Sequence, residues 1–203
     1  MTVTAVIPAY NEAERIQKVI AETLPFVNEV LVIDDGSADE TASNAQKAGA
    51  TVLRQSHQGY VPALKCGFRA AGGEIIVTID ADGEHDPAEI PRVTAPIKMG
   101  KVDLVLGRRE YVPSVSERFI GRIVRLRVDV HDHGTGFRGL ARELAVGLDL
   151  NGKCTCGVLV LEAVSKGARI AEVPITVRRV KKKRKRKWMH IVQAIYVLLQ
   201  TMR

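Results

Sequence analysis

Short apolar runs rich in β-branched residues alternate with helix-forming segments through the first half of the chain. The apolar runs cover residues 4–7, 30–33, 51–53, 75–79 and 102–106. Helical spacing and helix start and stop signals predict helices over residues 12–24, 39–48, 60–71 and 89–99 between them. Strands and helices that alternate in this way form a parallel sheet covered by helices on both faces. The chain is therefore predicted to be an α/β protein with a mostly parallel sheet.

Two carboxylates follow the fourth apolar run. Asp80 and Asp82 stand one residue apart where the run ends, with Glu84 close behind. Neighbouring carboxylates repel each other unless a cation lies between them, and oxygen ligands suit Mg²⁺ or Mn²⁺. Asp86 and Pro87 predict the cap and first turn of the next helix. Although Asp-x-Asp alone is short and occurs by chance, its place after a strand favours a metal site of Asp80, Asp82 and Glu84.

Polar residues follow other predicted strands as well. Tyr10, Asp34 and Arg109 come after the first, second and last of the apolar runs. Since the carboxyl ends of parallel strands meet at one edge of a sheet, these residues and Asp80 are expected to line one crevice. Asn11 is expected to cap the first helix. Beyond Arg109 the pattern is less regular, with helices predicted over residues 114–128 and 156–166, a loop over 130–139 and an extended segment over 169–177.

The positive charge of the chain belongs to one segment. The 203 residues carry a net charge of +7, but residues 178–187 hold nine basic and no acidic side chains, which leaves 7 − 9 = −2 for the rest. No basic segment followed by an apolar one opens the sequence, and no apolar run is long enough to span a bilayer. Three scattered cysteines favour a reducing, intracellular compartment over a disulfide framework.

Several common site motifs do not occur in the sequence. The first strand is not followed by Gly-x-Gly-x-x-Gly, and neither a P-loop nor a nucleophile elbow is present. Cys154 and Cys156 lack a second pair of cysteines, so they do not favour a zinc site. These features argue against a Rossmann dinucleotide site, a P-loop nucleotide site and a serine hydrolase.

Five motifs follow one another along the chain. They are Val6-Ile7-Pro8-Ala9-Tyr10-Asn11-Glu12, Val32-Ile33-Asp34-Asp35-Gly36-Ser37, Asp80-Ala81-Asp82-Gly83-Glu84-His85, Gly107-Arg108-Arg109 and Asp132-His133-Gly134-Thr135-Gly136-Phe137-Arg138. In this order they resemble the motifs of the family-2 glycosyltransferases, and within that family they most resemble the polyprenyl-phosphate glycosyltransferases typified by dolichol-phosphate mannose synthase. The resemblance covers roughly residues 4–177.

The resemblance implies a GT-A fold over residues 1–177 and a role for each matched residue. Asp80, Ala81 and Asp82 match the motif that binds metal and sugar nucleotide, and Glu84 matches a further ligand. Arg109 matches an arginine near the diphosphate, and Asp132 and Arg138 match an acceptor-side motif. The residues that match positions holding the nucleotide base and ribose are Pro8, Tyr10, Glu12, Val32 and Asp34.

The chain departs from its relatives at several positions. Arg108 stands where relatives usually have serine, and Leu159 and Leu161 occupy a helix where relatives tend to be acidic. After residue 174 the basic run replaces the usual arginine, glycine and Ser-Lys. Arg179 and Lys185 match the acceptor-phosphate positions there only with an offset of one residue.

The expected chemistry depends on the acceptor. Negative charge grows on a leaving nucleoside diphosphate, and a cation on the acidic pair with Arg109 nearby would stabilise it. A hydroxyl acceptor needs a general base, for which Asp132 is the best candidate, or else it is a loop-capping residue. A lipid phosphate is already anionic and needs arginines instead. Arg118, Arg122 and Arg138 are available for that role, although helix arginines often lie on a solvated face.

The tail has three interpretations. Residues 188–203 are predicted to form an amphipathic helix, whose apolar face would comprise Trp188, Ile191, Val192, Ile195, Leu198, Leu199 and Met202. With the basic segment 178–187, this helix fits an anchor on an anionic membrane surface. The alternatives are nucleic-acid binding, which the sequence favours least, and packing on the domain or on a second subunit.

The sequence therefore predicts a cytoplasmic, membrane-peripheral, metal-dependent inverting glycosyltransferase, with Asp82 and Asp132 as its catalytic residues. The donor would be a GDP- or UDP-hexose, with mannose or glucose as the sugar, and the acceptor a dolichyl-type polyprenyl phosphate. A saccharide or other hydroxyl acceptor is the alternative within the class. A non-catalytic nucleotide- or nucleic-acid-binding protein is the alternative outside it. The donor base and the oligomeric state stay open.

Overall fold

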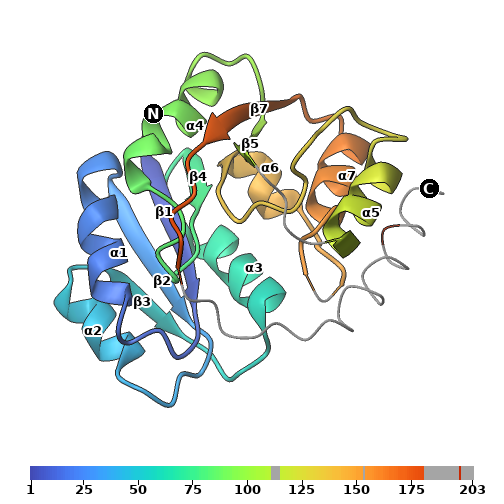
Figure 1. Ribbon diagram of the computed structural model, residues 1–203. Coiled ribbons are helices and arrows are strands. Elements are labelled where there is room, and N and C mark those ends of the chain that lie inside the picture. The colour runs from blue at the N-terminus through green and yellow to red at the C-terminus, as the bar shows by residue number, and fades with distance from the viewer. Residues whose placement is uncertain (111–114, 153, 181–196, 198–203) are drawn as a thin grey trace.

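The computed structural model describes residues 1–110, 115–152, 154–180 and 197, and its core is one seven-stranded sheet (Figure 1). The strand order is β3-β2-β1-β4-β6-β5-β7. All described strands run in the same direction except β6, which is antiparallel to both β4 and β5. The strands are β1 Val3–Ala9, β2 Glu29–Asp34, β3 Thr51–Arg54, β4 Ile75–Thr78, β5 Leu104–Arg109, β6 Arg138–Ala141 and β7 Ile170–Ile175.

Helices cover both faces of the sheet, as Figure 1 shows with α1 and α2 on one side of β1 and α3, α5, α6 and α7 on the other. The residues of β1 alternate between the two apolar layers: Val6 faces α3 and Ile7 faces α1. The helices are α1 Ile16–Thr23, α2 Thr41–Lys47, α3 Tyr60–Ala70, α4 Ile90–Lys98, α5 Val115–Val124, α6 Arg142–Gly147 and α7 Val158–Ser165, with short 3₁₀ turns at Leu24–Phe26 and Pro87–Glu89.

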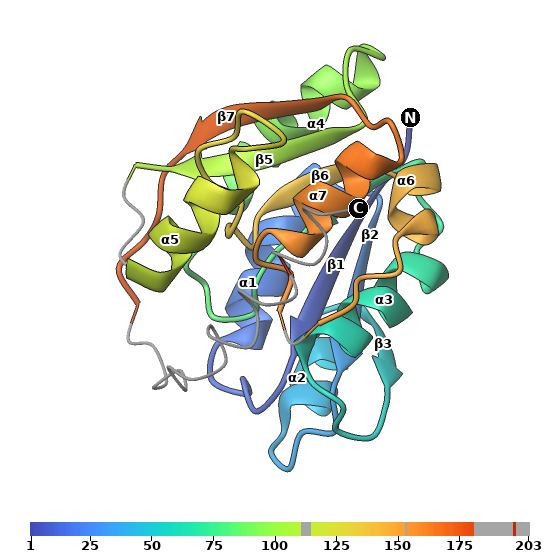
Figure 2. The same ribbon diagram turned by 90° about the vertical axis from the view of Figure 1, so that its right-hand side faces the viewer.

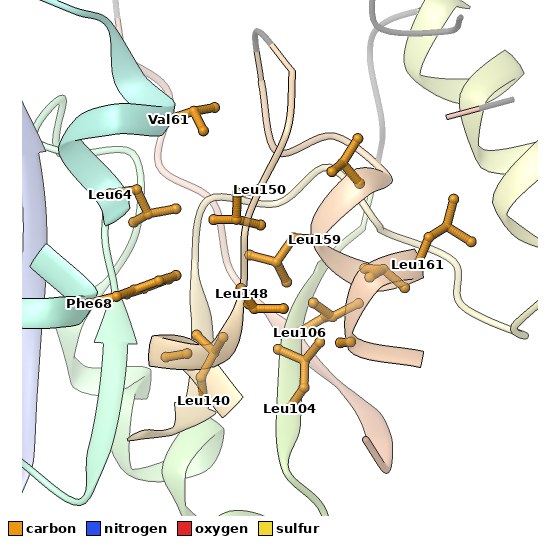
Figure 3. Close-up of a cluster of buried hydrophobic side chains, with 14 of the residues drawn as sticks. Val61, Leu64, Phe68, Leu104, Leu106, Leu140, Leu148, Leu150, Leu159 and Leu161 are labelled. Carbon is orange, nitrogen blue, oxygen red and sulfur yellow. The ribbon is translucent and has the colours of Figure 1, made fainter. Parts of the chain in front are cut away.

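The layer on the α3 side links the two halves of the chain. Figure 3 shows Leu148 and Leu150 between side chains of α3, such as Leu64, and side chains of α7, such as Leu159. Figure 2 shows α3, α6 and α7 together on this face. Because α7 begins directly after residues 154–157, this packing fixes that loop beside α3 and the end of β4.

Most predicted elements are confirmed, with two corrections. The first helix begins at Ile16 rather than at residue 12, and Asn11 is not its cap. Asn11 has φ +54°, and its Oδ1 accepts a hydrogen bond from the Ala38 N–H at 2.8 Å. The end of the predicted loop 130–139 is wrong as well, since Arg138 begins β6. The Asp86 cap is confirmed, because its side chain accepts from Ala88 N.

The predicted basic segment and C-terminal helix lie almost wholly outside the described residues. Arg178, Arg179 and Val180 are described, and of residues 188–203 only Val197 is. Val197 is helical, fully buried and in the same apolar cluster as Val124. It is not part of the predicted apolar face, so membrane contact by that face stays a prediction. No helix in the described part of the chain has both the length and the apolar character needed to cross a bilayer.

Candidate active site

A cavity of about 340 Å³ lies where β1, β4 and β5 end. Nine of the predicted site residues line it, together with residues from α3, α5 and the loops before β6 and α7. The predicted residues are Pro8, Tyr10, Glu12, Asp80, Ala81, Asp82, Glu84, Arg109 and Arg138. The others are Tyr60, His85, Glu117, Gly134, Gly136, Cys154, Thr155 and Cys156. The convergence predicted from the strand ends is therefore observed for β1, β4 and β5.

The acidic pair faces this cavity in a setting that disfavours two free negative charges. Burial raises the pKa of Asp82, and the charge of Asp80 raises it further. The Glu84 N–H donates to Asp82 Oδ1 at 3.0 Å, which holds that carboxylate in place. The Tyr60 hydroxyl donates to Asp80 Oδ1 at 3.4 Å, and burial followed by the charge of Asp80 raises the Tyr60 pKa. The phenol therefore stays protonated and remains a donor.

Gly136 lets the loop before β6 pack directly on Asp80. A Cβ at this position would lie 2.1 Å from Asp80 Oδ2, so any side chain larger than that of glycine would displace the carboxylate. The Thr78 hydroxyl at the end of β4 donates to the Gly136 carbonyl at 2.6 Å and joins the loop to the strand. A backbone contact therefore sets the position of the Asp80 carboxylate.

His85 is buried beside the same carboxylate. Its ring stacks on Phe137, with centroids 5.4 Å apart, and its Nδ1 lies 3.9 Å from Asp80 Oδ2. In the part of the chain that the structure describes, this Nδ1 has no hydrogen-bond partner. An unpartnered buried nitrogen next to a carboxylate is available to an additional polar group or cation.

Arg109 is held by two carboxylates of the protein. Its Nε and Nη2 donate to the two oxygens of Asp132 at 2.7 and 2.8 Å, and Nη2 also donates to Glu117 at 3.1 Å. Burial alone would raise the pKa of Asp132, but the hydrogen bonds and charge of Arg109 outweigh it and lower that pKa. Asp132 is buried, ionised and outside the cavity lining. Its geometry is that of an orienting carboxylate, while Glu117 is the carboxylate of this cluster that lines the cavity.

Arg138 differs from Arg109 because most of its donors are available. It is among the largest fully buried side chains of the described residues, and its Nη2 donates to Thr155 Oγ1 at 2.9 Å. No described residue hydrogen-bonds to its Nε or Nη1, and the side chain lines the cavity. A buried guanidinium with unmade hydrogen bonds is a strong binding site for a phosphate or carboxylate.

Only some of the residues predicted to contact the nucleotide base and ribose line the cavity. Tyr10 is exposed at its rim and stacks on His57, with ring centroids 4.2 Å apart. Val32 is buried in β2, and Asp34 at the end of β2 is buried as well. Asp34 accepts from Arg54 Nε at 2.8 Å. Val32 and Asp34 therefore do not line the cavity, and contact between either residue and a base stays a prediction.

The predicted acceptor arginines are dispersed. Arg118 and Arg122 lie exposed on α5 and do not line the cavity. Arg179 lines a second hollow, which Asp82 also borders. Lys185 lies outside the described residues. Of the predicted phosphate ligands that the structure describes, Arg138 alone lines the main cavity.

Comparison with known proteins identifies the family. The family model described as glycosyl transferase family 2 matches residues 4–154. The chain belongs to glycosyl transferase family 2. It is 31% identical to a dolichol-phosphate mannosyltransferase of Pyrococcus furiosus over 87% of this chain and 56% of that protein. It is also 31% identical to a polyprenol monophosphomannose synthase of Mycolicibacterium smegmatis over 84% of this chain and 75% of that protein. The predicted family is confirmed.

Solved structures confirm the GT-A fold of this family-2 chain. The glucosyl-3-phosphoglycerate synthase of Mycobacterium tuberculosis, in complex with Mn²⁺ and UDP-glucose, superposes with a TM-score of 0.84. The two proteins are 25% identical over 98% of this chain and 78% of that one. The chain spans little more than half the length of the Pyrococcus relative.

The family-2 cavity fits a divalent cation. Of the described residues that line it, five are carboxylates and two are arginines, and one arginine is already paired with carboxylates. An anionic sugar nucleotide would be repelled by such a lining unless a cation came with it. Asp80 and Asp82 supply the oxygen ligands that Mg²⁺ or Mn²⁺ prefers. No group of three His, Cys, Asp or Glu residues in the described ranges is arranged to bind metal, so Glu84 as a third ligand stays a prediction.

Sequence reasoning missed several cavity residues. Tyr60, Glu117 and Thr155 reach the cavity from α3, α5 and the loop before α7. None of them belongs to a motif that ends a predicted strand, and that position was the signal used to find the site. His85 closes one of the quoted motifs and could have been found by asking which polar residue there is buried.

Proposed function

We propose that this glycosyltransferase moves a hexose from a nucleoside-diphosphate sugar to a polyprenyl phosphate, with divalent metal and with inversion at the anomeric carbon. The observation that carries the proposal is the meeting of two opposite groups in one cavity. Asp80 and Asp82 present unneutralised negative charge, and Arg138 presents unpaired positive donors. The first suits a cation with a diphosphate, and the second suits an anionic acceptor. The names of the Pyrococcus and Mycolicibacterium relatives support this acceptor class.

On the donor side, Asp80 and Asp82 would hold the cation, with Glu84 as an additional ligand. A bound Mg²⁺ or Mn²⁺ would neutralise the charge that grows on the leaving diphosphate. Gly136 and Tyr60 keep the Asp80 carboxylate in position. Pro8, Tyr10, Glu12, Val32 and Asp34 stay our candidates for contacts with the base and ribose. The relatives do not decide between GDP and UDP, or between mannose and glucose.

On the acceptor side, Arg138 would bind and orient the phosphate. A phosphate monoester is already anionic at neutral pH, so it attacks without giving up a proton to a base. Asp132 is then an orienting residue, because its oxygens are taken by Arg109. Arg109 in turn would act on the diphosphate mainly by fixing Glu117 and Asp132 around it. Arg118, Arg179 and Lys185 stay candidates for contacts with phosphate outside the cavity.

Our test compares Asp82→Ala with Asp129→Ala, which removes an exposed carboxylate that does not line the cavity. We expect Mn²⁺-dependent binding of GDP or UDP, measured by calorimetry, to disappear in Asp82→Ala and persist in Asp129→Ala. Turnover with a polyprenyl phosphate should follow the same order. Equal nucleotide binding by the two variants would remove the metal role. Nucleotide binding without turnover on any acceptor would instead support a non-catalytic binding protein.

We also place the protein on the cytoplasmic face of the membrane, held by the segment 178–187 and the helix 188–203. Nine basic side chains near anionic headgroups are worth about 1 kcal/mol each. Deletion of residues 181–203 removes seven of these nine side chains and should therefore reduce sedimentation with anionic liposomes and leave sedimentation with neutral liposomes unchanged. Equal binding to anionic liposomes by both forms would contradict the anchor. Because Val197 is buried, thermal unfolding of the truncated protein must be measured as a control.

A hydroxyl acceptor is the second candidate. Glu117 lines the cavity beside Arg109 and could accept the proton or the hydrogen bond of a hydroxyl group. The Mycobacterium tuberculosis synthase, crystallised with UDP-glucose and phosphoglyceric acid, supports this candidate. Glu117→Gln distinguishes the two. It should abolish transfer to a hydroxyl acceptor and largely spare transfer to a phosphate.

A further inference from the structure

Two cysteines lie at the anion-binding end of the cavity. Cys154 and Cys156 both line it, on the loop that leads into α7 and next to Thr155. The sequence pattern gave them no role, because a second pair of cysteines is missing. In the structure they flank Thr155, whose hydroxyl accepts a hydrogen bond from Arg138.

The two sulfur atoms already interact. The Cys156 N–H donates to Cys154 Sγ at 3.4 Å, and the Cys156 thiol also hydrogen-bonds to Cys154. That thiol bond, helped by the charge of Arg138, lowers the pKa of Cys154 below its ordinary value despite burial. The same bond and burial raise the pKa of Cys156. Cys154 is thus the better nucleophile of the pair, and Cys156 is placed to react second.

We propose that Cys154 and Cys156 form a dithiol modification site that reacts with small-molecule disulfides and thereby controls the Arg138 pocket. The Cys154 thiolate attacks one sulfur of the reagent, forming a mixed disulfide and releasing one thiolate. Cys156 then loses its proton to solvent and attacks Cys154 Sγ, which forms the Cys154–Cys156 disulfide and releases the second thiolate. The two cysteines are oxidised, and the reagent is reduced to two thiols.

The position of Thr155 explains why this modification matters for activity. A bond between residues 154 and 156 closes a very small ring around Thr155 and changes its backbone. Thr155 Oγ1 accepts a hydrogen bond from Arg138 Nη2, while no described residue hydrogen-bonds to Arg138 Nε or Nη1. Loss of that contact lets the guanidinium turn, and a shift of about 1 Å at a reacting group can cost about 10²-fold in rate. Such short disulfides are also easily reduced, so the modification is reversible.

The test begins with the wild-type protein, treated with oxidised glutathione and then alkylated. Trypsin cleaves after Lys153 and Lys166, so one peptide, 154–166, contains both cysteines. We expect this peptide to lose the mass of two hydrogens and to escape alkylation, and dithiothreitol to reverse both changes. Cys66 lies in a different surface hollow on α3, so Cys66→Ser should behave as the wild type does. A peptide 154–166 with both thiols alkylated after oxidation would overturn the proposal.

Single substitutions distinguish the role of the Cys154 sulfur from that of the Cys156 sulfur. Cys156→Ser should retain glutathione on residue 154, whereas Cys154→Ser should form neither the mixed nor the internal disulfide. Glutathione retained equally by both variants would contradict the assigned order of attack.

The effect on activity is the turnover rate of the oxidised enzyme divided by that of the reduced enzyme. This part of the test rests on the proposed function. We expect a fall of about 10²-fold in the wild type, reversed by dithiothreitol, and a ratio near one in Cys154→Ser. A ratio near one in fully oxidised wild type would overturn control of the Arg138 pocket. If reduced enzyme transfers no hexose to any acceptor, the proposed function fails, while the peptide masses still decide the modification site.

Discussion

Gly136 offers a direct test of how the site is built, because a single methyl group there meets a predicted metal ligand. The Cβ of Gly136→Ala would lie 2.1, 2.6 and 2.7 Å from Oδ2, Cγ and Oδ1 of Asp80. Ordinary contacts begin near 3.4 Å, so the carboxylate must move by about 3.4 − 2.1 = 1.3 Å. A misplacement of about 1 Å in a catalytic constellation can cost about 10²-fold in rate. We therefore expect kcat/KM to fall by about that factor.

The same substitution should have little effect on folding. Asp80 is 31% exposed, so its side chain can move toward the cavity without disturbing the core. Overpacking costs of about 1 kcal/mol would lower Tm by about 2–4 °C in a chain of this size. The assays are thermal unfolding, Mn²⁺-dependent nucleotide binding by calorimetry, and release of nucleoside diphosphate during turnover.

Gly134→Ala is the matched control because Gly134 also lines the cavity. Its added Cβ would lie 3.4 Å from Arg109 Nη2 and 3.4 Å from Glu117 Oε2, which are ordinary contacts. Its activity and metal-dependent binding should stay close to wild type. If Gly136→Ala binds Mn²⁺ and nucleotide as tightly as Gly134→Ala does, then the position of Asp80 does not control the site and the reasoning is refuted.

Two further predictions concern the buried charges. Arg138→Met should abolish transfer to a phosphate acceptor. It should leave Tm equal or higher, because a buried cation with unmade hydrogen bonds lowers stability. A large drop in Tm would show that Arg138 has a structural role. Asp132→Asn should lower the free energy of unfolding at pH 7 by about 3–5 kcal/mol, since it leaves Arg109 buried without its main partner. The pKa of Asp132 is lowered on folding, so its contribution is present above the unfolded value of about 3.9 and is lost as pH falls through the folded pKa. Urea unfolding should therefore show the difference between wild type and Asp132→Asn shrinking below about pH 4, and a difference independent of pH would contradict the pairing.

The donor side of the cavity could be predicted from the sequence for a physical reason. Parallel strands place their carboxyl ends on one edge, so any polar residue that follows a buried run is brought there. Asp80, Tyr10 and Arg109 obey this rule, and all three line the cavity. Asp34 follows a buried run too, but Arg54 on the neighbouring strand β3 binds its carboxylate and keeps it away from the cavity. A residue's position at the end of a strand predicts where it lies but not which side chain it binds.

Arg138 was predicted from the family motif and not from a strand end, because its place in the cavity depends on a strand that runs against the others. β6 has four residues, including a glycine and an arginine, and carries no apolar alternation of its own. It forms because β4 and β5 supply hydrogen-bonding partners on both sides. That pairing buries the side chain of Arg138 and presses Gly136 against Asp80.

The pairing of Arg109 has the largest consequence for mechanism. The family resemblance implied a diphosphate contact for Arg109 at the end of β5, but its Nε and Nη2 already donate to Asp132 and Glu117. An arginine with two carboxylates adds no net positive charge to a cavity that already contains an acidic pair. Under the proposed function, and within the described cavity lining, the positive charge that receives an anionic donor would come from a cation on Asp80 and Asp82, and the positive charge that receives an anionic acceptor would come from Arg138. The two substrates would therefore be recognised by separate positive centres, which allows metal-dependent donor binding and acceptor binding to be lost independently, in Asp82→Ala and in Arg138→Met.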